Sequence, residues 1–235
     1  VTIEGLRLES SGGDGVYLGA GQVPYCKDVV IRDVVCHDNH RQGISVIGAE
    51  NLLIENCVFS ETGGTAPQAG IDFEPNHARE RLVNCVVRRC RFERNAGAGV
   101  LLYTKNLTDQ SEPVSIRVED CVMRGDEVGI AIGAARDNGP DGEVVFRRCV
   151  VERPRHAGTY VYDKSANAYT VVFDQCHFKH TWSEPRPGGP NAPLLISLRR
   201  DRITERFGGI RFDACHVYDT EDRPALVTEN DTGDA

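Results

Sequence analysis

The stretch LLIENCVFSETGGTAPQAGIDFEP (52–75) holds three short alternations of apolar and polar residues, separated by turn residues. Alternation with a period of two is typical of a β-strand that buries one face. The last alternation, GIDFE (70–74), places Ile71 and Phe73 on one face and Asp72 and Glu74 on the other. We therefore expect the two carboxylates to point outward from an exposed strand.

Both halves of this stretch recur along the chain. The glycine-led phrase appears as GVYLG (15–19), GISVI (43–47), GIDFE (70–74), GVLLY (99–103), GIAIG (129–133) and GTYVY (158–162), with its glycines 27 to 30 residues apart. A second phrase, such as VVIRDVVCHD (29–38), lies between them. A period just under 30 residues with three short strands predicts an all-β parallel β-helix of about eight turns, stacked about 4.8 Å apart. We expect it to span residues 1–220, with 221–235 as an acidic tail that is disordered or caps the end.

Six cysteines share one column of the second phrase: Cys57, Cys90, Cys121, Cys149, Cys176 and Cys215. Neighbours in a stacked column point the same way, which is poor geometry for a disulfide. A row of thiols also does not converge as tetrahedral metal ligands do. We expect buried, unpaired thiols, and no role is assigned to Cys26, Cys36 or Cys85.

The charge and the apolar runs of the chain limit the classes of partner that we expect. The net charge is −8 and there is no basic tract, which argues against nucleic acid as a partner. No apolar run approaches the roughly 20 residues that cross a bilayer, so no membrane partner is expected. No leader precedes Val1, so an exported (periplasmic or extracellular) protein would have its leader outside this stretch. A cytoplasmic location stays open, because unpaired cysteines suit it.

The stacked phrases, such as the stretch 52–75, resemble the right-handed parallel β-helix superfamily that contains pectate lyases, polygalacturonases, iota-carrageenases and mannuronan C5-epimerases. The resemblance covers residues 1–220 and implies a right-handed solenoid that acts on a polysaccharide or oligosaccharide. In that superfamily the sheet that begins with the glycine-led phrase usually forms the sugar-binding cleft. The solenoid ends would also permit oligomerisation.

Aligning the glycines brings distant residues onto one patch of that sheet. The candidates for catalysis are Asp72, Glu74, His40 and Arg41. The candidates for substrate binding are Asp14, Tyr17, Ser45, His77, Tyr103, Lys105, Tyr160 and Tyr162, since tyrosine faces are rigid, amphipathic platforms for sugars.

The first hypothesis is a glycoside hydrolase without a cofactor. Such an enzyme needs one protonated and one ionised carboxyl group, and repulsion between Asp72 and Glu74 would raise one pKa. The strand rise places their Cα atoms about 6.6 Å apart, which leans towards an inverting enzyme. Iota-carrageenases are similar in placing an acid-x-acid pair on one strand. The polygalacturonase signatures Asn-Thr-Asp and Gly-His-Gly are absent.

The second hypothesis is a calcium-dependent polysaccharide lyase or uronate epimerase. Asp72 and Glu74 would then hold Ca²⁺, and Lys105, Arg41 or His40 would remove the C5 proton. The third is a non-catalytic carbohydrate-binding or structural solenoid with solvated carboxylates. Trp182, in a Pro/Gly-rich loop, is either a lid over the sugar or a local hydrophobic pin. Cys36, His37 and His40 resemble a metal set, although a turn is the favoured interpretation.

Overall fold

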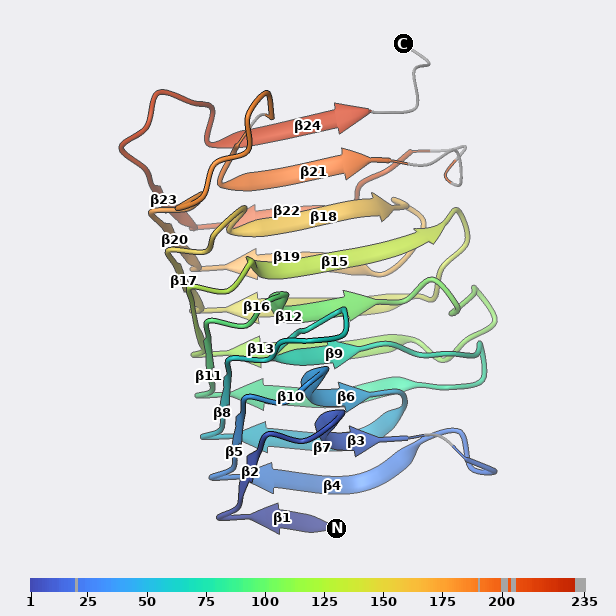
Figure 1. Cartoon of the computed structure of the whole chain (residues 1–235). Helices are drawn as coiled ribbons and strands as arrows, with labels where there is room; N and C mark the ends of the chain where they lie inside the picture. The colour runs from blue at the N-terminus through green and yellow to red at the C-terminus, as the bar shows by residue number, and fades with distance from the viewer. Residues whose placement is uncertain (20, 190, 200–202, 204–205, 231–235) are drawn as a thin grey trace.

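The computed structural model describes residues 1–19, 21–189, 191–199, 203 and 206–230, and within them the chain forms strands and no helix. The strands form three parallel sheets of eight, which stack along one axis from the N-terminus to the C-terminus (Figure 1). Each turn contributes one strand to each sheet. The prediction of an all-β parallel solenoid of about eight turns is confirmed.

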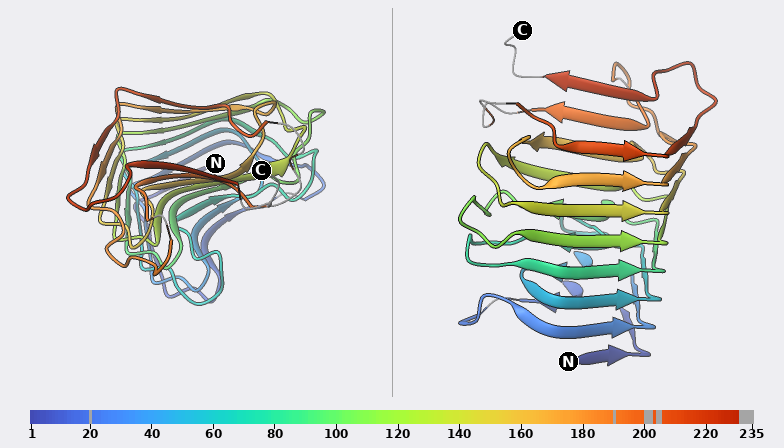
Figure 2. Two further views of the ribbon diagram at one scale, coloured as in Figure 1. Left: turned by 90° about the horizontal axis from the view of Figure 1, so that it is seen from above. Right: turned by 180° about the vertical axis from the view of Figure 1, so that it is seen from behind.

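Sheet A lies behind sheet C in Figure 1 and faces the viewer in Figure 2 (right). Its strands, in spatial order, are β1 (Thr2–Glu4), β4 (Cys26–Arg32), β7 (Ala49–Glu55), β10 (Leu82–Arg88), β13 (Val114–Glu119), β16 (Gly142–Arg147), β19 (Thr170–Asp174) and β22 (Ile210–Asp213).

Sheet B is built from three-residue strands that follow sheet A directly in each turn. They are β2 (Arg7–Glu9), β5 (Val35–His37), β8 (Val58–Ser60), β11 (Arg91–Glu93), β14 (Val122–Arg124), β17 (Val150–Glu152), β20 (His177–Lys179) and β23 (His216–Tyr218).

Sheet C carries the glycine-led phrases. Its strands are β3 (Asp14–Leu18), β6 (Gln42–Val46), β9 (Ile71–Phe73), β12 (Ala98–Tyr103), β15 (Val128–Arg136), β18 (Thr159–Lys164), β21 (Leu194–Leu198) and β24 (Leu226–Asn230). Seen along the solenoid axis, successive turns lie over one another (Figure 2, left). Loops of varied length project where sheet C begins and ends. Because β24 pairs with β21, the solenoid continues past residue 220, and residues 231–235 of the expected tail lie outside the described residues.

The core is a set of columns, because residues in register on neighbouring turns point the same way. In sheet B, Phe59 and Phe92 are in register, both fully buried, with their rings stacked at 5.3 Å between centroids. In sheet A, Phe146, Phe173 and Phe212 form a similar stack at 5.1 and 4.8 Å. No turn can bury these faces alone, so each depends on its neighbours for stability.

A left-handed residue turns the chain from sheet A into sheet B. The residues at this corner all have φ between 48° and 54°: Asn56, Arg89, Asp120, Arg148, Gln175 and Ala214. Each precedes a cysteine of the shared column. The thiols of these cysteines are unpaired and reach main-chain carbonyls of the preceding turn, as Cys149 does with Val118 O at 3.3 Å.

The three remaining cysteines lie in other columns. Cys36 is in register with Leu8 and Phe59 inside sheet B, and Cys85 is in register with Leu52 and Ile116 in sheet A. Cys26 pairs with Ala49 at the start of sheet A. The described residues contain no helix long and apolar enough to cross a membrane.

Replacing Phe92 with alanine should lower the free energy of unfolding by about 3–5 kcal/mol, since it removes a fully buried ring from the stack with Phe59. Urea unfolding followed by circular dichroism measures the loss. Tyr218→Ala is the control, because Tyr218 is 58% exposed and its change should stay within about 0.5 kcal/mol. Equal losses in both variants would contradict the column description of the core.

Candidate functional site

The register of sheet C places residues from successive turns side by side on its outer face. Ser45 pairs with Asp72, Asp72 with Leu101, and Leu101 with Ala131. The column continues through Tyr160 and Leu195. The predicted convergence of residues about 30 positions apart is therefore present in the structure.

Asp72 is fully buried, so the expectation of an exposed carboxylate is wrong. The side chain of Gln42 provides the physical reason. Its Nε2 donates to Asp72 Oδ2 at 2.6 Å, and its Oε1 accepts from the main-chain N–H of Ala69 at 3.2 Å. Gln42 thereby ties the segment that leads into β9 against the carboxyl group. The second oxygen, Oδ1, is buried and has no hydrogen-bond partner.

The side chain of Glu74, two residues after Asp72 in the chain, is 26% exposed. Burial and the negative charge of Glu74 raise the pKa of Asp72 to about 8, although the hydrogen bond from Gln42 acts in the opposite direction. A buried carboxyl group beside a second carboxyl group therefore favours its protonated form.

Arg41 connects two acids of different turns. Its guanidinium lies 3.5 Å from Asp14 Oδ2 and 3.5 Å from Glu74 Oε2. The hydroxyl of Ser45 donates to the same oxygen of Asp14 at 2.8 Å. We call this group, which consists of Asp14, Arg41, Gln42, Ser45, Asp72 and Glu74, the Asp72 cluster. Every member of the cluster except Gln42 was predicted from the sequence. The available signal for Gln42 was its polar side chain on β6, the strand that pairs with the strand of Asp72.

His40 is not part of the cluster. Its Nε2 lies 3.1 Å from Thr65 Oγ1, and its carbonyl accepts the N–H of Thr65 at 2.9 Å. Its main-chain N–H also donates to Ser11 O at 2.9 Å, so His40 connects the loop that precedes β9 to the preceding turn. Two predicted binding residues also lie apart: Tyr17 is 57% exposed and its ring lies against Gly19, and the exposed His77 donates its main-chain N–H to Glu80.

The other three predicted tyrosines, Tyr103, Tyr160 and Tyr162, lie close together. Tyr162 lies between Tyr103, at 6.4 Å between ring centroids, and Tyr160, at 5.1 Å. Lys105 Nζ lies 4.9 Å from the ring centroid of Tyr103. The guanidinium of Arg199, which the sequence did not single out, lies 4.2 Å from the ring centroid of Tyr162.

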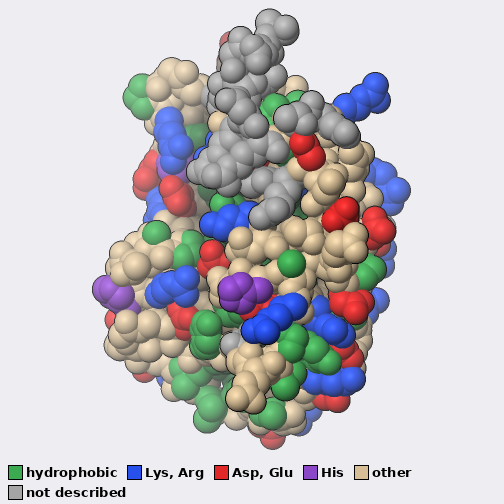
Figure 3. All heavy atoms as spheres, turned by 90° about the vertical axis from the view of Figure 1, so that its right-hand side faces the viewer, with side chains coloured by type: hydrophobic (Ala, Val, Ile, Leu, Met, Phe, Trp, Pro, Cys, Tyr) green, Lys and Arg blue, Asp and Glu red, His purple; other side chains and the backbone are tan. Residues whose placement is uncertain are grey.

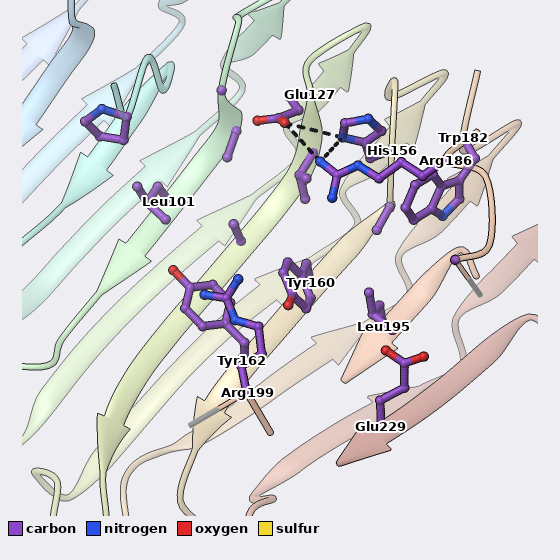
Figure 4. Close-up of a pocket in the computed structure, with 17 residues that line it drawn as sticks. Leu101, Glu127, His156, Tyr160, Tyr162, Trp182, Arg186, Leu195, Arg199 and Glu229 are labelled. Carbon is purple, nitrogen blue, oxygen red and sulfur yellow. Dashed lines mark hydrogen bonds and ion pairs between the residues drawn. The ribbon is translucent and has the colours of Figure 1, made fainter. Parts of the chain in front are cut away.

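A cavity of about 430 Å³ opens on the same face, beginning at Leu101 beside Asp72. We call it the aromatic pocket. Its lining includes Leu101, Glu127, Ala131, His156, Ala157, Tyr160, Tyr162, Trp182, Arg186, Leu195, Arg199 and Glu229. Figure 4 shows Arg199 beside the tyrosines on one side, and Glu127, His156 and Arg186 grouped on the other.

Trp182 both pins its loop and lines the pocket. Its Nε1 donates to Ala192 O at 2.8 Å, and its ring lies 5.2 Å from that of His156. His156 Nδ1 is 3.4 Å from Glu127 Oε1 and 3.2 Å from Arg186. Burial, with the nearby positive charge of Arg186, lowers the pKa of His156 below its ordinary value. The imidazole is therefore neutral at neutral pH.

Within the described part of the chain, no group of three or more His, Cys, Asp or Glu side chains could hold a metal ion. Cys36 points into the core, and His37 Nδ1 lies 3.0 Å from Ser60 Oγ. Where the strands of sheet C end, lysine and arginine side chains are intermixed with acidic ones over the described surface (Figure 3).

The fold and the site define a parallel β-helix protein with a buried carboxyl group, that of Asp72, and an aromatic pocket on one sheet. Residues 1–166 match the family model described as the right handed beta helix region, and the chain belongs to that family. The resemblance inferred from the repeated phrases, and with it the right-handed solenoid, is confirmed.

The chain is 29% identical over 135 residues to the SPbeta prophage-derived uncharacterized protein YorA of Bacillus subtilis (strain 168). It is 26% identical over 113 residues to the uncharacterized protein YclG of the same strain. The matches cover 52% and 43% of this chain but 22% and 19% of the relatives, so the chain spans about a fifth of their length.

Two solved structures are similar to this chain. The tailspike protein gp49 from Acinetobacter baumannii bacteriophage Fri1, a capsular polysaccharide depolymerase, has a TM-score of 0.50 and 16% identity, covering 90% of this chain and 38% of that one. The Agl-KA catalytic domain has a TM-score of 0.48 and 12% identity, covering 92% and 45%. At these identities the likeness concerns the fold alone.

The raised pKa of Asp72 predicts a specific pH dependence of stability. The folded state holds a proton that the unfolded state releases between its ordinary pKa of 3.8 and about 8, so stability falls as pH rises through that window. Asp72→Asn removes this loss. Its advantage in unfolding free energy over wild type should grow by at most about 1.4 kcal/mol per pH unit up to pH 8.

Urea unfolding at pH 4 to 9 measures this difference. Asp120→Asn serves as a control of opposite sign, since hydrogen bonding to Arg148 lowers the pKa of Asp120. That variant should lose stability relative to wild type as pH rises through the ordinary carboxyl range. A pH-independent difference for Asp72→Asn would show that Asp72 is not buried as a protonated acid.

Proposed function

We propose that this chain is the β-helix part of a polysaccharide-degrading enzyme, a glycoside hydrolase that uses Asp72 as proton donor and Glu74 as the partner carboxylate. The observation that carries the proposal is the full burial of Asp72 beside Glu74, where burial and the neighbouring charge raise the pKa of Asp72 to about 8. At neutral pH the pair then holds one proton. One protonated and one ionised carboxyl group are what glycoside hydrolysis needs.

In the reaction we propose, the glycosidic oxygen replaces Glu74 as the acceptor of the Asp72 proton. The bond from the anomeric carbon to that oxygen breaks, and the leaving sugar departs with the proton. Water attacks the anomeric carbon and gives its proton to Glu74. The proton then passes from Glu74 back to Asp72, which restores the resting state of the pair.

Access to Asp72 requires movement of the side chains around it. Asp72 has no exposed surface, whereas Glu74 and Arg41 are 26% and 33% exposed. Their mutual contact is long, at 3.5 Å, and lies on the accessible side of the cluster. We propose that an entering sugar displaces Glu74 and Arg41 towards the solvent and so reaches the Asp72 carboxyl group.

The position of the aromatic pocket supports a polymeric substrate. Leu101, in register with Asp72, is part of the pocket lining, so the pocket begins one turn, about 4.8 Å, from the carboxyl pair. A chain of sugars could contact both sites at once. The tailspike neighbour, a capsular polysaccharide depolymerase of the same fold, makes bacterial capsular polysaccharides the first substrates to test.

The test is a panel of bacterial capsular polysaccharides and uronate polymers, incubated with wild type, Asp72→Asn and Glu74→Gln, with products separated by size and identified by mass spectrometry. We expect wild type to release saturated oligosaccharides and each variant to lose about 10²- to 10⁴-fold in rate. Glu143→Gln, an exposed acid-to-amide change on sheet A, should keep the wild-type rate.

Three results would argue against the proposal. Full activity of either site variant would remove the carboxyl pair from the mechanism. Products that absorb near 235 nm, together with loss of activity in EDTA, would instead support the calcium-dependent lyase. Binding without cleavage of any polymer would support the non-catalytic solenoid.

A further inference from the structure

The outer face of sheet C changes character along the solenoid axis. Turns two and three place Ser45 and Asp72 at one outward position, where the side chains are polar and hydrogen-bonded. From the next turn onwards the same position holds Leu101, Ala131, Tyr160 and Leu195. The outer face of sheet C therefore has a polar end at the Asp72 cluster and an apolar end at the aromatic pocket.

The apolar end is separate from the core of the solenoid. Ala157, Trp182 and Leu195 form their own buried cluster, against which Tyr160 and Val227 pack. Together with Ala131, which is 8% exposed, these side chains give the pocket an apolar floor and an aromatic wall. Such a surface suits the apolar face of a sugar ring or a methyl substituent better than a ring edge rich in hydroxyl groups.

The charges of the pocket cancel. Its ionised lining residues are Glu127, Arg186, Arg199 and Glu229, two of each sign. Arg186 lies 3.5 Å from Glu127, and His156 between them is neutral because its pKa is lowered. A pocket without excess positive charge, in a chain of net charge −8, gives no electrostatic preference for an acidic sugar.

The guanidinium of Arg199 supplies hydrogen-bond donors at the pocket. The guanidinium of Arg199 lies over Tyr162 and Tyr160, 4.2 and 5.5 Å from their ring centroids, and no carboxylate of the described residues forms an ion pair with it (Figure 4). A guanidinium offers only donors, so its complement in a neutral ligand is an acceptor oxygen, such as a hydroxyl or carbonyl oxygen. An amide group on a sugar provides that oxygen and a methyl group together.

We propose that the aromatic pocket, whose lining begins one turn from Asp72, is a subsite for a neutral N-acylated sugar. The sugar ring stacks on Tyr160, the acetamido methyl group contacts the neighbouring Ala131, and the acetamido carbonyl accepts a hydrogen bond from Arg199. The inference rests on the proposed function for its position in the polymer, and it names the substrate class as a polysaccharide that contains acetamido sugars.

The test is saturation-transfer difference NMR on the Asp72→Asn protein, which binds without turnover. The probes are the methyl glycosides of N-acetylglucosamine and N-acetylgalactosamine, compared with those of glucose, galactose and galacturonic acid. We expect the acetyl methyl protons to receive the strongest saturation. The acetamido glycosides should bind about fourfold or more tightly than their parent sugars, as burial of one methyl group implies.

Ala131→Leu, which fills the floor, should abolish the acetyl methyl signal. Ser115→Leu, which adds similar bulk at an exposed position of sheet A, should preserve it. The fluorescence of Trp182, the single tryptophan, should change on addition of the acetamido glycosides and provide a second measurement.

Equal binding of parent and acetamido glycosides, tighter binding of the galacturonide, or absence of any signal would overturn this inference. None of these results bears on cleavage, which is measured separately with the wild-type protein. Conversely, an inactive wild type that still shows the acetyl methyl contact would refute the proposed hydrolase and leave the subsite in place.

Discussion

Hydrogen bonding between stacked parallel strands is the constraint on which the rest of this structure depends. Because strands of successive turns lie about 4.8 Å apart, every side chain has as its neighbours the residues one period earlier and later. A buried column must therefore repeat apolar residues of compatible shape, as the Phe59–Phe92 stack does. The left-handed corner residues, such as Asn56 and Arg89, keep the turns superimposed.

The same constraint builds the Asp72 cluster. Asp14, Ser45 and Asp72 come from three successive turns, and no sequence segment could hold them together without the stacking. The stacking also places the carboxyl group of Asp72 beside Glu74 and against the Gln42 side chain, where ionisation of Asp72 is unfavourable. When Asp72 retains a proton, the cost of burying a charge and the repulsion by Glu74 are both avoided. This protonation is the chemical property on which the proposed function depends.

The aromatic pocket depends on a different feature of the solenoid, the loops between sheets B and C. The stacking fixes the floor, from Leu101 to Leu195, but the walls come from segments that vary in length between turns. Trp182 and Arg186 belong to the longest of these, and Trp182 is fixed by its hydrogen bond to Ala192. The polar end of sheet C thus arises from the periodic strands. The apolar end arises from these strands together with the aperiodic loops.

The sequence by itself determined the periodic features: three strands in each turn, the glycine-led sheet, the unpaired cysteines, and the convergence of Asp14, Arg41, Ser45, Asp72 and Glu74. These follow from local alternation and a fixed repeat length, which the order of residues states directly. Only the tertiary structure decided that Asp72 is buried, that His40 faces the Thr65 loop, and that Arg199, His156 and Trp182 surround one pocket. The physical reason is that loop paths and side-chain cover depend on packing between turns, which no periodic pattern specifies.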